Sequence, residues 1–285
     1  MTQQNRGWGL GARGSKRFSA FAVALLLSVS ADAQQPGRSA EAVALPDWSG
    51  AWQMIGPTVF DTATVEPKNG RAGDPGVRER PPYTAEYEAI YLKNIDAIKK
   101  GVFPDPISTC GVPHGMPRAF NVPDAYEFAV TPQQVWMITE NGPGIIRIYT
   151  DGRQHPRSED RWGTYTGDNI GRWEGDTLVI DTVSMKGWTE KDEILDRTGL
   201  VLSADAHVVT RLRRVDASTM EAQITVDDPK ALTKSWAVTK RYRKLPAGTR
   251  VYDYACGENN RNPVSETGRT LTLGSDGKPL DKVTK

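Results

Sequence analysis

The stretch of sequence that decides the fold is Gly163-Thr-Tyr-Thr-Gly-Asp-Asn-Ile-Gly-Arg-Trp-Glu-Gly-Asp-Thr-Leu-Val-Ile-Asp-Thr-Val183. Within it, Gly171-Arg-Trp173 is typical of a strand end, and Glu174-Gly-Asp176 is typical of a tight turn. The following run, Thr177–Val183, is rich in the β-branched residues that favour strands. The stretch therefore predicts a β-hairpin, with further strands added on either side of it.

Short β-type runs continue along the chain and are separated by Gly, Pro, Asn and Asp turn signals. Only about residues 85–100 carry a helical pattern, with Tyr87, Tyr91, Ile95 and Ile98 on roughly one face. We therefore predict a mainly β protein, an antiparallel meander that forms a barrel or a strongly curved sheet, with one helix. The predicted strands are Tyr126–Thr131, Gln134–Thr139, Gly144–Thr150, Gly163–Trp173, Thr177–Val183, Ala206–Val215, Met220–Val226 and Lys234–Lys244, and Trp52 lies on a first strand.

Length and charge limit the class of protein. The 285 residues suit one large β domain, predicted over residues 46–262, followed by a polar tail over 263–285. The segment Glu66–Pro82 is dominated by Gly, Pro, Arg and Asp and is predicted to be a long loop. The 36 Lys and Arg residues nearly balance 35 Asp and Glu residues, which leaves no broad basic field, so we expect no nucleic-acid partner.

The N-terminus has the layout of a secretory signal peptide. Basic residues in the first 17 positions precede an apolar run from Phe18 to Val29 and a small-residue site, Ala31-Asp-Ala33. An anchoring helix is the alternative, but the run is short of the roughly 20 residues that span a bilayer. We expect cleavage near Ala33, a flexible leader over 34–45, no membrane span in the mature chain, and a periplasmic or secreted location.

The sequence has two cysteines, Cys110 and Cys256. In an exported chain such a pair indicates a disulfide, although two reactive thiols remain an alternative. A disulfide would anchor the proline-rich loop that carries His114 and Arg118, which we list as candidate ligand-binding residues at the rim of a site.

Histidine is scarce, so the candidate acid–base residues are His155 and His207, with Asp168 and Asp181 as carboxylates to orient them. His207 opens a predicted strand and shares a side with Val209 and Arg211; an exposed histidine on a wet face is the alternative. Asp181 lies in an otherwise apolar strand, so it is either exposed or a buried carboxylate that needs a partner. A structural ion pair with Arg147 or Arg172 is the competing interpretation.

Further candidates for ligand binding come from the mixed polar face of the predicted sheet and from the hairpin. They are Arg147, Tyr149, Arg172, Trp173 and Arg211. The histidines have no metal-ligand spacing, and the sequence lacks a phosphate loop, a dinucleotide-binding glycine run and a Gly-x-Ser-x-Gly motif. We therefore expect no metal and no cofactor.

The chain resembles a largely uncharacterised family of exported bacterial proteins. The resemblance is carried by Asp47-Trp-Ser-Gly-Ala-Trp52, Cys110 to Arg118, Arg147 to Pro156, Gly171-Arg-Trp-Glu-Gly-Asp-Thr-Leu-Val-Ile-Asp-Thr182, Ser203 to Arg213, Ile224 to Pro229 and Tyr254 to Asn260. In that family pattern a Gly-His-Ser precedes the hairpin, whereas this chain has Gly167-Asp168-Asn169. The resemblance implies export and a lipocalin-like barrel, which the Gly50-Ala-Trp52 opening also favours, but no settled activity.

Three functions follow as expectations. The first is a protein that binds a small, partly apolar organic molecule in a barrel pocket, with Arg and His groups at its polar end. The second is a cofactor-free lyase, isomerase or hydrolase that uses the His and Asp residues in the same pocket. The third is a structural envelope or interaction protein, which would require a broad apolar surface and no cavity.

Overall fold

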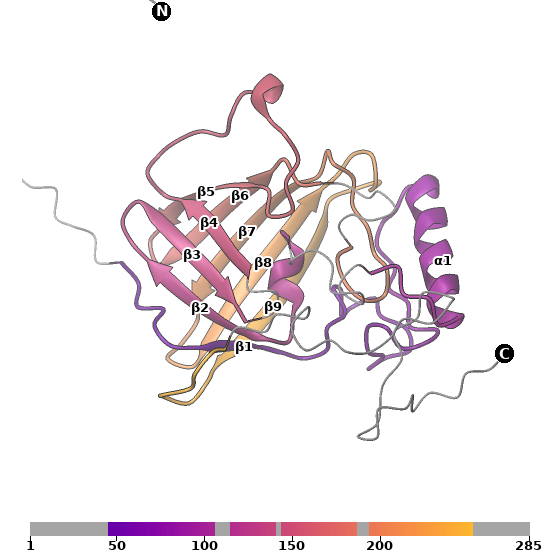
Figure 1. Ribbon diagram of the computed structural model, residues 1–285, viewed down its shortest axis with the longest axis horizontal. Helices are drawn as coiled ribbons and strands as arrows, with labels where there is room; N and C mark the ends of the chain where they lie inside the picture. The colour runs from indigo at the N-terminus through magenta and orange to yellow at the C-terminus, as the bar shows by residue number, and fades with distance from the viewer. Residues whose placement is uncertain (1–44, 106–114, 141–143, 187–193, 253–285) are drawn as a thin grey trace, which may run out of the picture. The chain divides into compact units, whose positions relative to one another are not determined.

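The computed structural model describes residues 45–105, 115–140, 144–186 and 194–252 (Figure 1). Their nine strands form one closed barrel in which each strand pairs with its neighbours in the chain and β1 pairs with β9. The strands are β1 (Trp52–Ile55), β2 (Ala125–Val130), β3 (Gln134–Thr139), β4 (Gly144–Tyr149), β5 (Asp168–Glu174), β6 (Thr177–Val183), β7 (His207–Arg214), β8 (Thr219–Asp227) and β9 (Trp236–Lys244). The predicted mainly β fold is confirmed, and the closed barrel is compatible with the lipocalin-like barrel that the resemblance implies.

The predicted hairpin is β5–β6, and its turn consists of Gly175 and Asp176 between the paired residues Glu174 and Thr177. Gly175 has a φ of 65°, a conformation that suits glycine at the first central position of a two-residue turn. Gly171 allows a second close approach, because a Cβ there would lie 2.8 Å from the Ile148 side chain inside the barrel. The local geometry thus explains why glycine occupies both positions.

One strand pairing departs from the predicted antiparallel meander. β4 and β5 are parallel and share the single register pair Tyr149↔Ile170. The chain leaves β4, forms a long loop over residues 150–167 with a short 3-10 helix η3 (Ser158–Asp160), and re-enters the sheet in the same direction (Figure 1). Because this loop takes the first residues of the expected strand, β5 begins at Asp168 rather than Gly163.

The barrel interior is filled by alternate side chains of the strands. Ile148, Leu178, Ile180, Val208 and Leu212 point inward and are almost completely buried. Trp52 is also buried, and its ring lies beside Arg214 and Lys244, the last residues of β7 and β9. These side chains form a packed apolar core inside the barrel.

The helix α1 (Ala85–Lys99) buries Tyr87, Tyr91, Ile95 and Ile98 as predicted. It contacts irregular segments beside the barrel rather than the sheet: Asn94 donates to Gly199 O at 2.8 Å, and Tyr91 donates to Thr198 at 3.2 Å.

Four charged side chains are buried together, and we call them the buried cluster: Asp61, Glu79, Asp196 and Lys240. Lys240 points into the barrel from β9 and donates to Val59 O at 2.6 Å. Glu79 and Asp196 accept from the backbone N–H of Phe60, at 3.1 and 2.8 Å. The cluster thus ties the segment around Phe60 to the barrel wall.

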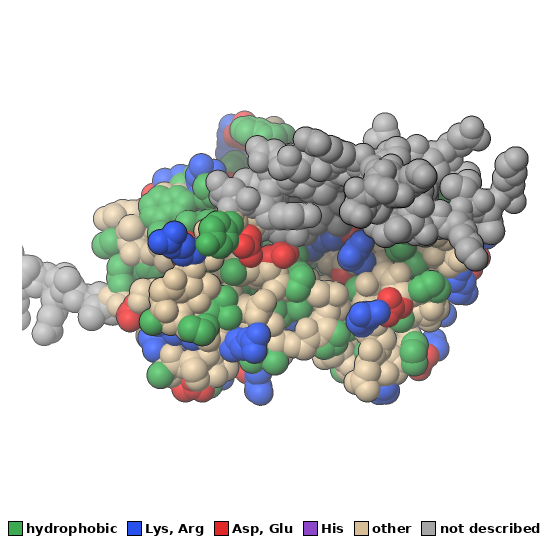
Figure 2. Space-filling model, turned by 60° about the horizontal axis from the view of Figure 1, so that its bottom comes forward, with side chains coloured by type: hydrophobic (Ala, Val, Ile, Leu, Met, Phe, Trp, Pro, Cys, Tyr) green, Lys and Arg blue, Asp and Glu red, His purple; other side chains and the backbone are tan. Residues whose placement is uncertain are grey.

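On the face shown in Figure 2, side chains of both charges are interspersed over the described residues. No helix among the described residues is long and apolar enough to span a membrane. The predicted signal peptide, the leader, the Cys110–Cys256 disulfide, His114 and the polar tail all lie outside the described residues.

Candidate functional site

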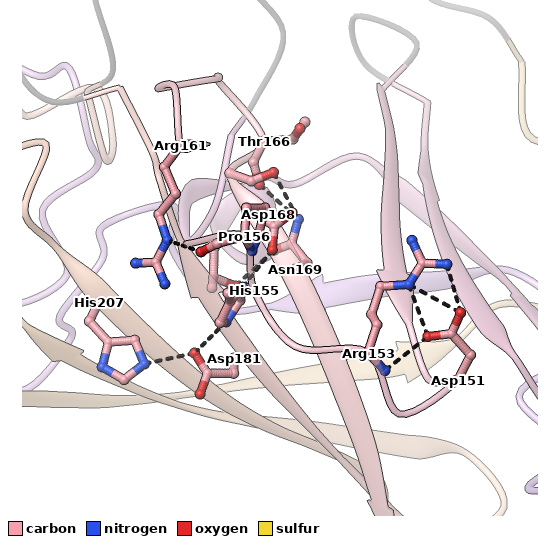
Figure 3. Close-up of polar contacts among 12 residues, drawn as sticks. Asp151, Arg153, His155, Pro156, Arg161, Thr166, Asp168, Asn169, Asp181 and His207 are labelled. Atoms are coloured by element: carbon pink, nitrogen blue, oxygen red, sulfur yellow. Dashed lines mark hydrogen bonds and ion pairs between the residues drawn. The ribbon is translucent and has the colours of Figure 1, made fainter. Parts of the chain in front are cut away.

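The four predicted acid–base residues come together in one hydrogen-bonded series, which we call the His–Asp chain (Figure 3). His155 Nδ1 lies 2.5 Å from Asp168 Oδ1, and His155 Nε2 lies 3.1 Å from Asp181 Oδ1. His207 Nε2 lies 2.7 Å from the same Asp181 oxygen. The order is therefore Asp168–His155–Asp181–His207.

The sheet register places three of these residues on the outer face of the barrel. Asp168 lies opposite Val183, and Ile170 lies opposite Asp181, so the two aspartates are on the same face of adjacent strands. On the other side of β6, the pairs Asp181↔Val209 and Thr182↔Val208 put His207 one step further along that face. The long 150–167 loop folds back over this face and supplies His155.

Buried polar contacts hold the base of the loop. Asn169, the inward-facing neighbour of Asp168, donates to Thr166 O at 2.9 Å and accepts from Thr182 Oγ1 at 2.7 Å. Gly167, with a φ of 70°, is needed there because a Cβ would lie 2.8 Å from the Thr182 side chain and 2.9 Å from Val183 O. The loop therefore leaves the sheet at a fixed point.

His155 has a carboxylate oxygen at each ring nitrogen. A neutral imidazole has one N–H, yet both ring nitrogens of His155 face carboxylate oxygens. With both carboxylates ionised, one contact would place two lone pairs against each other. Both contacts are hydrogen bonds at the same time only where the imidazole carries two protons or one of the two carboxyls is protonated.

His207 is the last residue of the His–Asp chain. Its Nε2 donates to Asp181, so in the neutral ring Nδ1 carries a lone pair that can accept a proton. No described residue bonds to that Nδ1, and the His207 side chain is 44% exposed compared with 13% for His155. His207 is thus the member best placed to meet a ligand.

An open cleft of about 650 Å³ lies over the His–Asp chain on the outside of the barrel. This volume is in the range of small-molecule sites. Its lining residues are His155, Arg161, Trp162, Gly163, Asp181, Val183, Ser184, Met185, Ala204, Asp205, Ala206 and His207. Three of the four predicted acid–base residues, His155, Asp181 and His207, line this cleft on the outside of the barrel.

Ser184 in the cleft wall has an unusual backbone. Its φ is 59°, a left-handed conformation that is uncommon for residues other than glycine and that concentrates at functional sites. The Thr164 N–H donates to Ser184 O at 3.0 Å. The hydroxyl oxygens of Ser184 and Thr164 are buried and have no hydrogen-bond partner among the described residues. The wall beside the His–Asp chain is thus locally strained.

Other predicted binding residues lie away from the cleft. Arg147 is exposed on the outer face of β4, and Tyr149 stacks under Arg153 with 3.8 Å from the guanidinium carbon to the ring centre. Arg172 and Arg211 both pair with Glu174, at 2.9 and 2.8 Å. None of them partners Asp181, so the alternative of a structural Arg–Asp181 pair is wrong.

Two further candidates, Trp173 and Arg118, have structural partners. Trp173 packs against Trp48, with 5.2 Å between ring centres. Arg118 is buried in a bidentate pair with Asp105, at 2.9 and 2.7 Å, and also donates to Ile194 O. The structure does not bring either side chain to the cleft.

Sequence reasoning missed Arg161, Trp162, Met185 and Asp205. Arg161 and Trp162 follow the short η3 turn in the loop, where the sequence has no periodic pattern. A tryptophan in so polar a segment was the one available signal. Its 76% exposure makes it unusual for so large an apolar side chain.

Comparison of the chain with models of protein families and with curated proteins finds no match. Among the described residues, no group of three or more His, Cys, Asp or Glu side chains has an arrangement that would hold a metal ion.

Proposed function

We propose that the protein is an acid–base enzyme that moves a proton on a small, partly apolar organic molecule bound in the outer cleft. The observation that carries the proposal is the Asp168–His155–Asp181–His207 chain, which ends beside the cleft at His207 Nδ1, a nitrogen that bonds to none of the described residues. A histidine oriented by a carboxylate is the usual arrangement for proton transfer in enzymes.

The proposed cycle starts with His207 neutral. Its Nδ1 takes a proton from a C–H or O–H group of the substrate, and the imidazolium that forms is stabilised by Asp181 at Nε2. The proton on His207 exchanges with solvent at the open cleft, and a proton is then delivered to another substrate atom, which gives an isomerisation, or to a leaving group, which gives an elimination.

Binding without catalysis is the second candidate function. The cleft volume and the exposed Trp162 favour it, because both suit capture of a small organic molecule. The two candidates share the cleft and differ in the role of His207. Export to the periplasm or beyond, and a Cys110–Cys256 disulfide that would form there, remain part of the proposal.

The test is deuterium incorporation from D₂O, since it detects proton transfer before the natural substrate is known. The full chain is incubated with a panel of keto acids, enones and β-hydroxy carbonyl compounds, and products are measured by mass spectrometry. At least one compound should gain deuterium or eliminate water roughly 100-fold faster than with His207→Gln.

Arg147→Gln is the matched control, since Arg147 is exposed on β4 and does not line the cleft. It should retain the wild-type rate. Equal rates for wild type and His207→Gln, or no compound altered by either, would reject the enzyme and leave the binding function.

A further inference from the structure

The arginines of the 150–167 loop differ in their partners. Arg153 pairs with Asp151 at 2.6 Å, and Arg157 pairs with Asp160 at 3.0 Å. Arg161 has no carboxylate partner among the described residues, and it is the arginine of the three that lines the cleft. The loop therefore carries two arginines that are neutralised locally and one that is not.

Arg161 is held at one point only. Its Nε donates to Pro156 O at 2.7 Å, and Pro156 directly follows His155. This bond fixes the guanidinium relative to the His–Asp chain and leaves both Nη groups without a partner among the described residues. In Figure 3 the Nη groups extend toward the side of His207. Two parallel N–H donors of this kind match the two oxygens of a carboxylate.

Next to Arg161 the cleft has an apolar wall. Trp162 is 76% exposed, and Met185 and Val183 also line the cleft. A ligand that covers the indole removes apolar surface from water, and a flexible methionine adapts to the shape of a ring. A cationic donor pair and an aromatic surface thus line the same cleft as His207.

We infer that the substrate is a small organic monoacid with an apolar, ring-sized body. Its carboxylate pairs with the Arg161 Nη groups, its body packs on Trp162, and a carbon near the carboxylate faces His207 Nδ1. This inference rests on the proposed function for the role of His207. Asp205 lies two residues before His207 in the cleft lining and disfavours a second carboxylate on the ligand.

The test is a binding series read by NMR chemical-shift titration of the full chain. The probes are acetate, phenylacetate and indole-3-acetate, with phenylacetamide, phenethylamine and phenylmalonate as neutral, cationic and dianionic relatives. Affinity should rise from acetate to indole-3-acetate. The amide, the amine and the dianion should each bind at least about tenfold more weakly than phenylacetate.

Two substitutions locate the effect. Arg161→Gln should weaken phenylacetate binding at least about tenfold, whereas Arg157→Gln should leave it unchanged, because Arg157 is already paired outside the cleft. Trp162→Ala should weaken indole-3-acetate more than acetate. Equal binding of the amide and the acid, no effect of Arg161→Gln, or no acid bound below about 10 mM would overturn the inference.

Failure of this inference is distinguishable from failure of the enzyme. If acids bind through Arg161 and none exchanges deuterium, the ligand class stands and the proposed catalysis is wrong. If neutral carbonyl compounds exchange equally fast with wild type and Arg161→Gln, catalysis stands and the monoacid is wrong.

Discussion

The His–Asp chain and the buried cluster are made from similar groups, carboxylates beside nitrogen bases, but they differ in access to water. Asp181 and His207 are 30% and 44% exposed at an open cleft. Glu79 and Lys240 are 0% and 4% exposed. Burial of this degree requires that polar groups be satisfied within the protein, whereas the cleft can leave an acceptor open for a ligand.

Hydrogen bonding shows the same contrast. In the buried cluster Glu79 accepts from the backbone of Phe60 and Asp61, and Trp236 Nε1 donates to Asp61 at 3.0 Å. In the His–Asp chain the series of bonds stops at His207 Nδ1. A strongly shifted pKa is therefore a poor guide to the candidate site in this protein, because Glu79 and Lys240, whose pKa values are strongly shifted, do not line the cleft.

The pKa directions agree with that distinction. Burial, followed by the Asp196 carboxylate beside it, raises the pKa of Glu79 well above its usual value. Burial lowers the pKa of Lys240 to about 8, although nearby Glu79, Asp196 and Asp61 oppose this effect. These shifts belong to a structural cluster that joins the segment around Phe60 to β9.

The largest expected effect is on stability at Glu79. Glu79→Ala removes the acceptor for the Asp61 N–H and leaves a cavity, which should lower the free energy of unfolding by about 3–5 kcal/mol. Asp181→Asn, at the partly exposed cleft, should lower it by less than about 1 kcal/mol. Urea denaturation of both variants measures the comparison.

Glu79→Gln is the matched control for the buried cluster. Glutamine keeps the shape and one carbonyl acceptor but turns an NH₂ group toward one of the two backbone N–H donors, so we expect a loss of about 1–3 kcal/mol, smaller than that of Glu79→Ala. A loss as large as that of Glu79→Ala would show that the cluster depends on an ionised Glu79.

Much of this fold and site could be predicted because two features of the sequence are strong signals: the alternation of apolar and polar residues along strands, and the small number of histidines. The β5–β6 hairpin follows from its turn and its β-branched strand, and β6 spans the predicted residues. With only three histidines in 285 residues, acid–base chemistry had few possible carriers. The period of two correctly placed Asp181 with Val179 and Val183 on one face of that strand.

The remaining features depend on contacts between distant segments. Whether Asp181 faces the inside or the outside of a barrel is set by closure of all nine strands, which no single strand encodes. The return of His155 over the sheet depends on the course of an irregular loop. Glu79 lies in the Gly- and Pro-rich stretch predicted to be a loop, where nothing local indicates complete burial.

A smaller effect is the pH dependence of stability that Lys240 produces. Its pKa is about 8 in the folded protein and near 10.5 in the unfolded chain, so between these values the unfolded chain binds more protons. Stability should therefore rise with pH above 8, by roughly 1 kcal/mol per unit. Above about 10 the buried tyrosines Tyr91 and Tyr126, whose pKa values burial raises, act in the opposite sense.

Lys240→Met isolates this contribution. Between pH 8 and 10 the free energy of unfolding of the wild type should rise relative to that of Lys240→Met, whatever the difference between the two proteins at pH 8. The measurement is urea denaturation at several pH values in that window. Parallel curves would mean that Lys240 stays charged in the folded protein, and the contrast between the two regions would then be weaker than we infer.

The smallest effect sharpens the comparison at the cleft itself. Asp168 contacts His155 but is separated from His207 by His155 and Asp181, so it acts as a positioning residue rather than a catalytic one. Asp168→Asn keeps the shape, and its amide oxygen still accepts from His155 Nδ1, but the compensating charge is lost. Activity in the deuterium assay should fall by about tenfold, compared with roughly 100-fold for His207→Gln.

The pH profile of activity separates an electrostatic role of Asp168 from a purely structural one. Losing the Asp168 charge should make protonation of the His–Asp chain harder, so the acidic limb of the profile should move to lower pH. A tenfold loss with an unchanged profile would mean that Asp168 only supports the loop, and the His–Asp chain would reduce to Asp181 and His207.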